Sequence, residues 1–97
     1  MFYIKVHDAG YRKIIAVCDK NIIGKSFRKD NLVLNISEDF YKGEIKSIEE
    51  TKTALTSGEN LNIAGNEAIN LCLDLGLINK ENIKEIEGTQ YAMILEL

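Results

Sequence analysis

The first 36 residues contain four short β-like stretches separated by turn residues, and this arrangement restricts the fold more than any other feature. The stretches lie at 2–7, 12–18, 22–27 and 32–36. Side chains in these stretches alternate with a period of two, which is typical of strands. The first two stretches should form a hairpin. The regular spacing of all four predicts an antiparallel meander or partial barrel.

The chain contains no proline, so the ends of helices must be inferred from other residues. Ser47 and Glu50 have the spacing of a capping box, which predicts a short helix from this point to about Thr56. A second helix should begin at Asn66, where apolar residues start to recur at helical spacing. It should end at Gly76, since glycine suits the left-handed residue that terminates a helix.

Two further segments complete the predicted fold. Leu61 and Ile63 fit either a brief strand or the start of the second helix. Residues 83–86 and 90–97 flank a turn and predict a closing hairpin, one face of which carries Tyr91, Met93, Leu95 and Leu97. We therefore expect a single α+β domain over residues 1–97, with an antiparallel N-terminal β unit, two helices and a C-terminal β hairpin.

Charge is distributed unevenly along the chain. Residues 1–48 contain nine basic and six acidic residues, a net charge of +3. Residues 49–97 contain three basic and nine acidic residues, a net charge of −6. An asymmetry of this kind can mark the surface that meets a polyanion. It directs the search for a binding site to the first half.

The composition argues against several classes of function. The chain has two cysteines, Cys18 and Cys72, and one histidine, His7, too few ligands for a tetrahedral zinc site. Both cysteines lie among apolar residues and should be inert core thiols, and His7 should lie on the surface. We find no nucleophile or cofactor motif and expect no catalytic residue, metal or cofactor. Without a signal peptide or a long apolar run, the protein should be cytoplasmic and not bound to a membrane.

The best binding candidate is the basic and aromatic stretch KSFRK at residues 25–29. Lysine and arginine neutralise phosphates, and aromatic rings stack on unpaired bases. The residues expected to contact RNA are Arg12, Lys13, Lys25, Phe27, Arg28, Lys29, Tyr41 and Lys42. The alternative for the KSFRK stretch is a solvated turn with Phe27 in the core. Likewise, Phe40 could anchor the core while Tyr41 caps an edge.

A weaker anion site is predicted at Gly65 and Asn66, where backbone amides open the second helix. Glu67 would repel a phosphate at this position. The alternative is that Asn66 caps the helix and Gly65 permits close packing.

An ordered set of segments also resembles a known family. The segments are MFYIKV (1–6), AVCD (16–19), IGK (23–25) with Phe27, LVL (32–34), DFYKG (39–43), NIAGNE (62–67), GLI (76–78), EN (81–82) and Gly88. Their order and spacing resemble the archaeal "domain of unknown function 424" family, whose members are small proteins made essentially of this one domain. The resemblance covers nearly the whole chain.

The resemblance implies a function in general terms only. The family has no established activity and is usually described as RNA-binding, which implies a role linked to translation or the ribosome. Family members commonly carry a Gly-Val-Pro-His-Ala-Gln-like stretch near the C-terminus, and the matching residues here are GTQYAM (88–93). A role that depends on that imidazole is therefore not carried over to this chain.

These observations lead us to expect a non-enzymatic module that binds RNA or a ribosomal particle. The main alternative is an adaptor that binds a basic protein through its acidic second half, with Glu49, Glu50, Glu81, Glu85 and Glu87. A small enzyme is the least favoured alternative. The sequence leaves the oligomeric state open.

Overall fold

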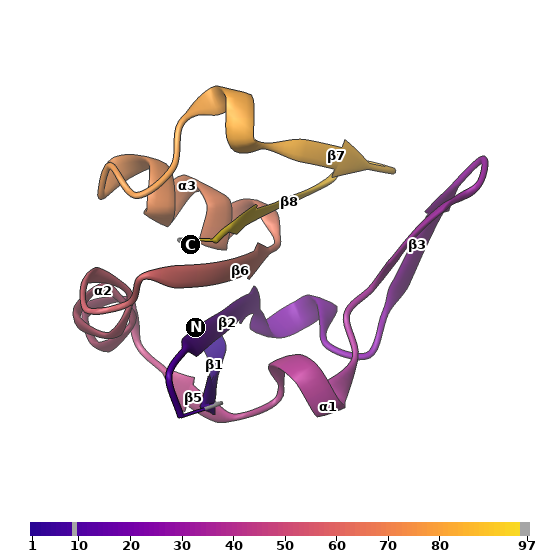
Figure 1. The fold of residues 1–97 in the computed structure, drawn as a ribbon. Helices are drawn as coiled ribbons and strands as arrows, with labels where there is room; N and C mark the ends of the chain where they lie inside the picture. The colour runs from indigo at the N-terminus through magenta and orange to yellow at the C-terminus, as the bar shows by residue number, and fades with distance from the viewer. Residues whose placement is uncertain (9, 96–97) are drawn as a thin grey trace.

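The computed structural model describes residues 1–8 and 10–95 and has the expected α+β fold (Figure 1). Within these residues the strands are β1 (Phe2–Asp8), β2 (Lys13–Asp19), β3 (Ser26–Lys29), β4 (Leu32–Asn35), β5 (Glu44–Lys46), β6 (Asn60–Ala64), β7 (Lys84–Ile86) and β8 (Thr89–Ile94). The α-helices are α1 (Glu38–Tyr41), α2 (Ile48–Thr56) and α3 (Asn66–Asp74), and the 3-10 turns are η1 (Lys20–Ile22) and η2 (Lys80–Asn82).

Six strands form one mixed sheet in the order β5-β1-β2-β6-β8-β7. β1 and β2 make the predicted antiparallel hairpin, in which Phe2 lies opposite Asp19. β6 pairs in parallel with β2 and antiparallel with β8. It therefore joins the two hairpins into one sheet. Leu61 and Ile63 belong to this strand and are buried, which resolves the ambiguity between strand and helix.

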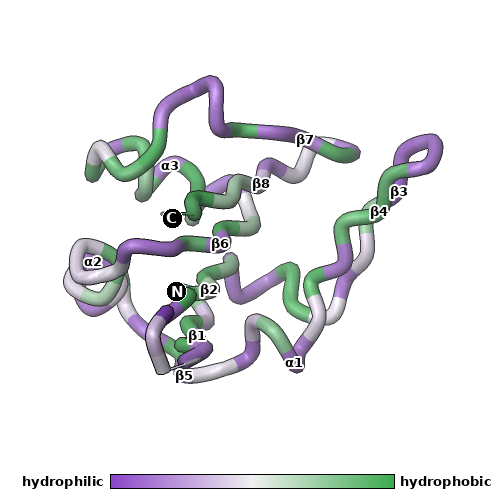
Figure 2. The backbone as a smooth tube through the Cα atoms, viewed as in Figure 1, coloured by the Kyte–Doolittle hydropathy of each residue, from purple (hydrophilic) through white to green (hydrophobic). Residues whose placement is uncertain are grey.

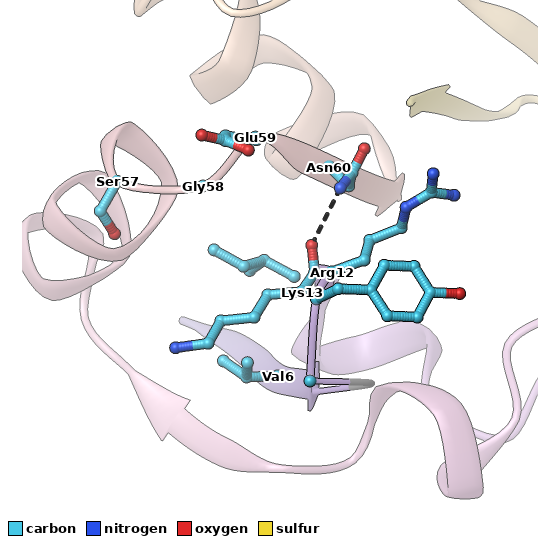
Figure 3. Close-up of a pocket in the computed structure, with 10 residues that line it drawn as sticks. Val6, Arg12, Lys13, Ser57, Gly58, Glu59 and Asn60 are labelled. Atoms are coloured by element: carbon cyan, nitrogen blue, oxygen red, sulfur yellow. Dashed lines mark hydrogen bonds between the residues drawn. The ribbon is translucent and has the colours of Figure 1, made fainter. Parts of the chain in front are cut away.

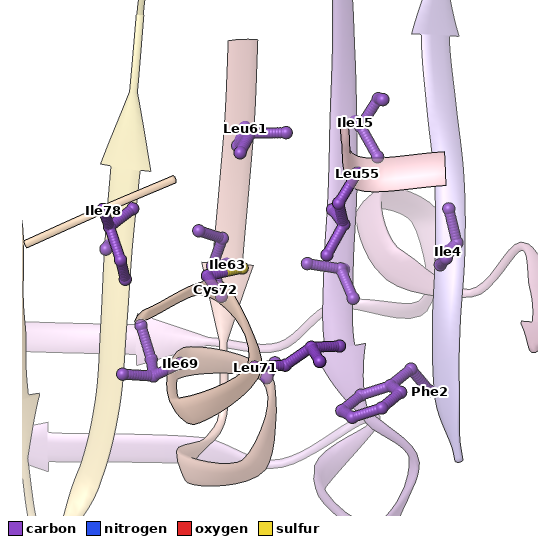
Figure 4. Close-up of a cluster of buried hydrophobic side chains, with 13 residues drawn as sticks. Phe2, Ile4, Ile15, Leu55, Leu61, Ile63, Ile69, Leu71, Cys72 and Ile78 are labelled. Carbon is purple, nitrogen blue, oxygen red and sulfur yellow. The ribbon is translucent and has the colours of Figure 1, made fainter. Parts of the chain in front are cut away.

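Helices α2 and α3 cover one face of this sheet and build the larger core cluster (Figure 4). Val17 of β2 and Ile63 of β6 lie on this face and are fully buried. They share the cluster with Leu55 of α2 and with Ile69 and Cys72 of α3. The apolar residues whose spacing predicts the second helix are thus the residues that pack against the sheet.

A second cluster lies on the other face and is built by different elements. Cys18 of β2 and Ala64 of β6 pack with Ile22 of η1, Ile36 and Tyr41. The cover on this face comes from η1, from α1 and from the segment that follows β4. This second cluster accounts for the burial of most apolar residues between β2 and α2.

The predicted meander ends after β2, because the next segment leaves the main sheet. Ile22 is buried in a 3-10 turn and does not begin a third strand. Gly24 has a φ of 81°, and hydrogen bonds of 2.7 and 2.9 Å join Gly24 to Ile36 and Ile36 to Lys25. β3 and β4 form a separate two-stranded ribbon that projects from the body of the molecule (Figure 1). The partial barrel is therefore a wrong prediction, and the sheet is open.

Both predicted helices are confirmed, together with the N-cap of the first and the C-terminal end of the second. The Ser47 hydroxyl accepts from the Glu50 amide at 3.2 Å, and the Glu50 carboxylate accepts from the Ser47 amide at 3.1 Å. The bond from the Ser47 amide lowers the pKa of Glu50. At the end of α3, Gly76 has a φ of 73°, and the Leu77 amide donates to the Cys72 carbonyl at 3.0 Å. This is the bonding of a Schellman motif.

The sequence patterns do not predict two short elements, α1 and β5. α1 is a single turn whose first amides are capped by Ser37, with 3.3 Å between the Phe40 nitrogen and the Ser37 oxygen. β5 pairs with β1 at one edge of the sheet. Among the helices of the described residues, none has both the length and the apolar character needed to cross a membrane.

β7 and β8 form the predicted closing hairpin. Its turn residues, Glu87 and Gly88, have φ values of 50° and 81°, as a type I′ turn requires. The face predicted to be shared carries Tyr91, Met93 and Leu95, while Leu97 lies outside the described residues. Met93 and Leu95 are about half exposed, because this face points away from α3.

Candidate nucleic-acid interface

Three of the cations expected to contact RNA lie on the β3–β4 ribbon or directly before it. Lys25, Arg28 and Lys29 are exposed, and none of them forms an ion pair with any residue that the structure describes. Figure 2 shows a hydrophilic tip on a ribbon whose stem is partly hydrophobic. Arg28 and Lys29 therefore lie on the projecting ribbon, with Asp30 in its turn, whereas Lys25 lies at its base, where its backbone bonds to Ile22 and Ile36.

Phe27 anchors this ribbon and offers little surface to a base. It is half-buried and lies opposite Leu34 across the two strands. Both side chains pack against the second cluster, which contains Ile36. The alternative that assigned Phe27 to the core is therefore the better description.

A hydrogen bond joins the ribbon to the C-terminal hairpin. The Arg28 amide donates to the Glu87 carboxylate at 2.6 Å. Glu87 lies in the tight turn between β7 and β8, so the turn and the ribbon hold each other in position. The Arg28 guanidinium remains exposed.

Arg12 and Lys13 lie far from the ribbon. Lys13 begins β2, whereas the chain continues to the ribbon from Asp19 at the other end of the strand. A strand advances about 3.3 Å per residue, so about 20 Å separates the two ends. Figure 3 shows the Arg12 and Lys13 side chains extending in opposite directions. Arg12 and Lys13 therefore form a group separate from Lys25, Arg28 and Lys29, and the predicted cations do not make one patch.

A cleft of about 740 Å³ opens beside Arg12 and Lys13 (Figure 3). It lies between the β1–β2 turn and the α2–β6 turn, and Tyr11 is part of its lining. Tyr11 is 91% exposed. It provides an aromatic surface that could not be recognised from the sequence patterns above. The available signal is the triplet YRK at residues 11–13, an aromatic residue beside two cations in the first turn.

The stacking role predicted for Tyr41 is wrong. Tyr41 is 5% exposed, and its hydroxyl donates a short hydrogen bond to the Asn62 side-chain oxygen. Burial raises the pKa of the Tyr41 phenol. Lys42 is exposed, and its ammonium lies 4.0 Å from the Glu38 carboxylate, an exposed and therefore weak pair. Around α1, Tyr41 is thus structural, while Lys42 stays on the surface, apart from the ribbon.

His7 and Phe40 form a pair that links β1 to α1. Their rings stack with centroids 4.4 Å apart, and the His7 Nε2 atom lies 2.8 Å from the Phe40 carbonyl oxygen. Because a carbonyl oxygen only accepts hydrogen bonds, Nε2 must carry a proton. His7 is half-buried and not the surface residue expected.

Asp19 occupies the place of the predicted anion site. Its carboxylate accepts from the Glu67 amide at 3.1 Å and from the Ala68 amide at 2.8 Å. Gly65 is the N-cap of α3, with a φ of 107°. These two amides are thus bound to the protein's own carboxylate and are not available to a phosphate. Burial raises the pKa of Asp19, although the two amides act in the opposite direction.

Asn66 binds the stretch that departs from the family pattern. Its side chain donates to the Gly88 carbonyl at 3.0 Å and accepts from the Gln90 amide at 2.8 Å. Asn66 is the first residue of α3 and not its cap. The side chain therefore fastens the start of the helix to β8, a packing role.

The cysteines are buried core thiols, as expected. Cys18 and Cys72 are buried and free, and burial raises the pKa of each thiol to about 12. Thiolates are the reactive form of cysteine, so both should be inert at neutral pH. Within residues 1–8 and 10–95, no three potential metal-ligating side chains gather in one place.

The fold and these surfaces define a small α+β protein with a mixed sheet and a projecting basic ribbon. Residues 7–97 match the model of a family described as "Protein of unknown function (DUF424)", and the chain belongs to this family. No curated protein matches the chain.

A solved structure shares the fold. The chain is similar to an uncharacterized conserved protein from Methanopyrus kandleri, with 24% sequence identity and a TM-score of 0.77. The match covers 96% of this chain and 89% of that one. The function has to be argued from the surfaces, because a shared fold does not specify it.

Proposed function

We propose that this protein is a non-enzymatic module that binds RNA or a ribonucleoprotein in archaeal translation or RNA metabolism. The observation that supports this function best is the projecting ribbon, at which Lys25, Arg28 and Lys29 are exposed and have no ion pair among the described residues. Lysine and arginine bind phosphates and release their counterions, which supplies most of the affinity that does not depend on sequence.

The ribbon can contact phosphates from two sides. Arg28 lies opposite Val33, and Lys29 lies opposite Leu32. Adjacent residues of a strand point to opposite faces, so the two cations are directed to different faces of the ribbon. A thin element of this kind can follow a nucleic-acid backbone with a cation on each face.

The charge of the rest of the chain favours binding of RNA through the ribbon. The net charge is −3, and all of the excess acid lies in the second half. A polyanion should therefore attract the ribbon and repel the acidic surface. The contact is expected to be local, and its affinity should depend strongly on salt.

The protein adaptor is the second proposal, and the geometry supports it less well. Its acids would be Glu49, Glu50, Glu81, Glu85 and Glu87. Three of them are engaged within the protein: Glu50 with Ser47, Glu49 with Lys52 at 3.5 Å, and Glu87 with the Arg28 amide. All five are exposed, and Glu81 and Glu85 are the two with no such contact among the described residues. A pull-down from nuclease-treated lysate separates the proposals, because only a protein contact survives the loss of RNA.

The test of RNA binding is fluorescence anisotropy of labelled single-stranded and structured RNA at two salt concentrations. For a single strand, log K should fall with log salt by about 0.7 for each phosphate contact. The Lys25→Ala/Arg28→Ala/Lys29→Ala variant should bind more weakly, and its slope should be smaller by about 2, the effect of three lost contacts.

The matched control removes the same charge from the other half of the chain. Lys52→Ala/Lys80→Ala/Lys84→Ala deletes all three cations of residues 49–97 and should keep the wild-type slope. An unchanged slope in the ribbon variant, or no binding by the wild-type protein at low salt, would exclude the ribbon as an RNA contact.

A further inference from the structure

The cleft beside Arg12 has walls held in place by the sheet. Asn60, at the start of β6, donates from its side-chain amide to the Lys13 carbonyl at 3.2 Å (Figure 3). The backbones of β2 and β6 also pair at this point, with Ile14 opposite Asn60. Lys13 and Asn60, which line the cleft, are thus fixed by two neighbouring strands of the sheet.

The floor of the cleft is apolar and closely packed. Val6 and Ile15 contribute to it. Gly58 passes so near to Ile15 that a Cβ on Gly58 would collide with the Ile15 side chain. The volume of about 740 Å³ falls within the range of about 300–1,000 Å³ that is usual for small-molecule sites.

The cations of the cleft are available to an anionic ligand. Arg12 is half-buried and has no ion pair among the residues that the structure describes. The Lys13 ammonium lies 4.0 Å from the Asp8 carboxylate, and both side chains are more than half exposed. An exposed pair at this distance is weak, so a phosphate can replace it. Glu59 adds one carboxylate to the lining.

Tyr11 gives the cleft an unused aromatic surface. At 91% exposure, its ring gains nothing from packing within the protein. A tyrosine ring beside an arginine is the combination that binds an unstacked base next to its phosphate. A simple anion would not use the ring, and a purely apolar ligand would not use the cations.

We propose that this cleft binds a single nucleotide, with the base stacked on Tyr11 and the phosphate held by Arg12. The site is distinct from the ribbon, because the two lie at opposite ends of β2. This site would add a second RNA contact to the proposed function. The proposal rests on that function only in taking RNA as one possible source of the nucleotide. That source is either a single-stranded RNA or a free nucleotide.

The experiment is an NMR titration of the full chain with AMP and, separately, with the trinucleotide ApApA. We expect amide shifts concentrated at residues 10–13 and 57–60. Tyr11→Ala should weaken the binding of ApApA about tenfold, the usual order for one lost base stack, and Tyr11→Phe should retain it. Arg12→Ala should weaken binding and flatten its salt dependence, whereas Lys80→Ala should not.

The ribbon variant and the cleft variants separate this site from the ribbon. If ApApA binds and the ribbon variant Lys25→Ala/Arg28→Ala/Lys29→Ala retains that binding, the cleft is an independent nucleotide site. If neither probe shifts residues 10–13 at millimolar concentration, or if Tyr11→Ala binds like the wild type, the cleft proposal is overturned. In that case the ribbon can still bind longer RNA, and the anisotropy test decides the proposed function separately.

AMP binding as tightly as ApApA identifies a free nucleotide as the ligand, and tighter binding of ApApA identifies an RNA strand.

Discussion

The Asp19 carboxylate accepts a hydrogen bond from the Ala68 amide at 2.8 Å, which joins the end of β2 to the first turn of α3. The N-cap of α3 is Gly65, which has no side chain to bind the free amides of the helix. Asp19 supplies the missing acceptor from 49 residues away in the sequence. The cap is therefore a tertiary contact, and it fixes the helix against the centre of the sheet.

Removing this acceptor should destabilise the protein. Asp19→Ala leaves the buried Ala68 amide without a partner and should lower the free energy of unfolding by about 2 kcal/mol. Urea denaturation measures the change. The control is Asp74→Ala, an exposed acid in the last turn of the same helix, which should change stability by less than about 0.5 kcal/mol. Equal unfolding midpoints for Asp19→Ala and the wild type would contradict a capping role.

Gly65→Ala should be the more damaging of two glycine substitutions. Gly65 has a φ of 107°, and a Cβ there would collide with the Asp19 carboxylate. We expect a loss of at least about 2 kcal/mol, from backbone strain and the displaced cap together. Gly76 has a φ of 73°, and a Cβ there would meet open space. Gly76→Ala should therefore lower the free energy of unfolding by only about 1 kcal/mol.

A double-mutant cycle isolates the collision at Gly65. Combined with Asp19→Ala, Gly65→Ala should cost less than it does alone, because the clashing carboxylate is gone. Additive losses in the double variant would show that the strain at Gly65 does not involve Asp19.

The ionisation of Asp19 should make stability fall as pH rises above the acid range. Burial raises the pKa of Asp19 above its ordinary value of 3.8, so the folded protein holds this proton to a higher pH than the unfolded chain. The resulting stabilisation is complete below the unfolded pKa and is lost as pH rises through the folded pKa. A carbon-detected NMR titration of the Asp19 carboxyl measures this directly. A midpoint at or below 3.8 would show that the two amide bonds outweigh burial.

Tyr41→Phe should affect stability and leave RNA binding unchanged. The substitution removes the hydroxyl that donates to Asn62 and leaves a partly buried oxygen without its partner. The expected loss is about 1–2 kcal/mol in the free energy of unfolding. Anisotropy on the same variant should give the wild-type affinity for RNA. A weaker affinity with normal stability would return Tyr41 to the binding surface.

Elements whose interacting residues lie close together in the chain could be predicted from the sequence. The capping box at Ser47 and Glu50, the end of α3 at Gly76 and the closing turn at Glu87 are all confirmed. Each depends on contacts within a few residues, so the amino acids involved are themselves the signal. The alternation in residues 2–7 likewise predicts β1 without knowledge of its neighbours.

The binding surfaces were harder to predict, because exposure depends on what the rest of the chain covers. Tyr11 and Tyr41 both stand beside basic residues, and nothing local distinguishes them. α1 turns Tyr41 onto Asn62, 21 residues away, whereas the turn after β1 leaves Tyr11 in solvent. Similarly, Lys13 and Lys25 are close in sequence, yet they lie near opposite ends of β2.

The sequence by itself determined the local elements of this protein, namely the hairpins, two helices, the N-cap of α2 and the C-terminal end of α3, because period, turn residues and local caps act over a few positions. It also determined the excess of cations in the first half. Only the tertiary structure decided that β6 joins β2 in parallel and that the ribbon leaves the sheet after Ile22. It also decided that Asp19 accepts hydrogen bonds from the first amides of α3. These features depend on burial and hydrogen bonds between distant residues, for which a single sequence carries no local signal.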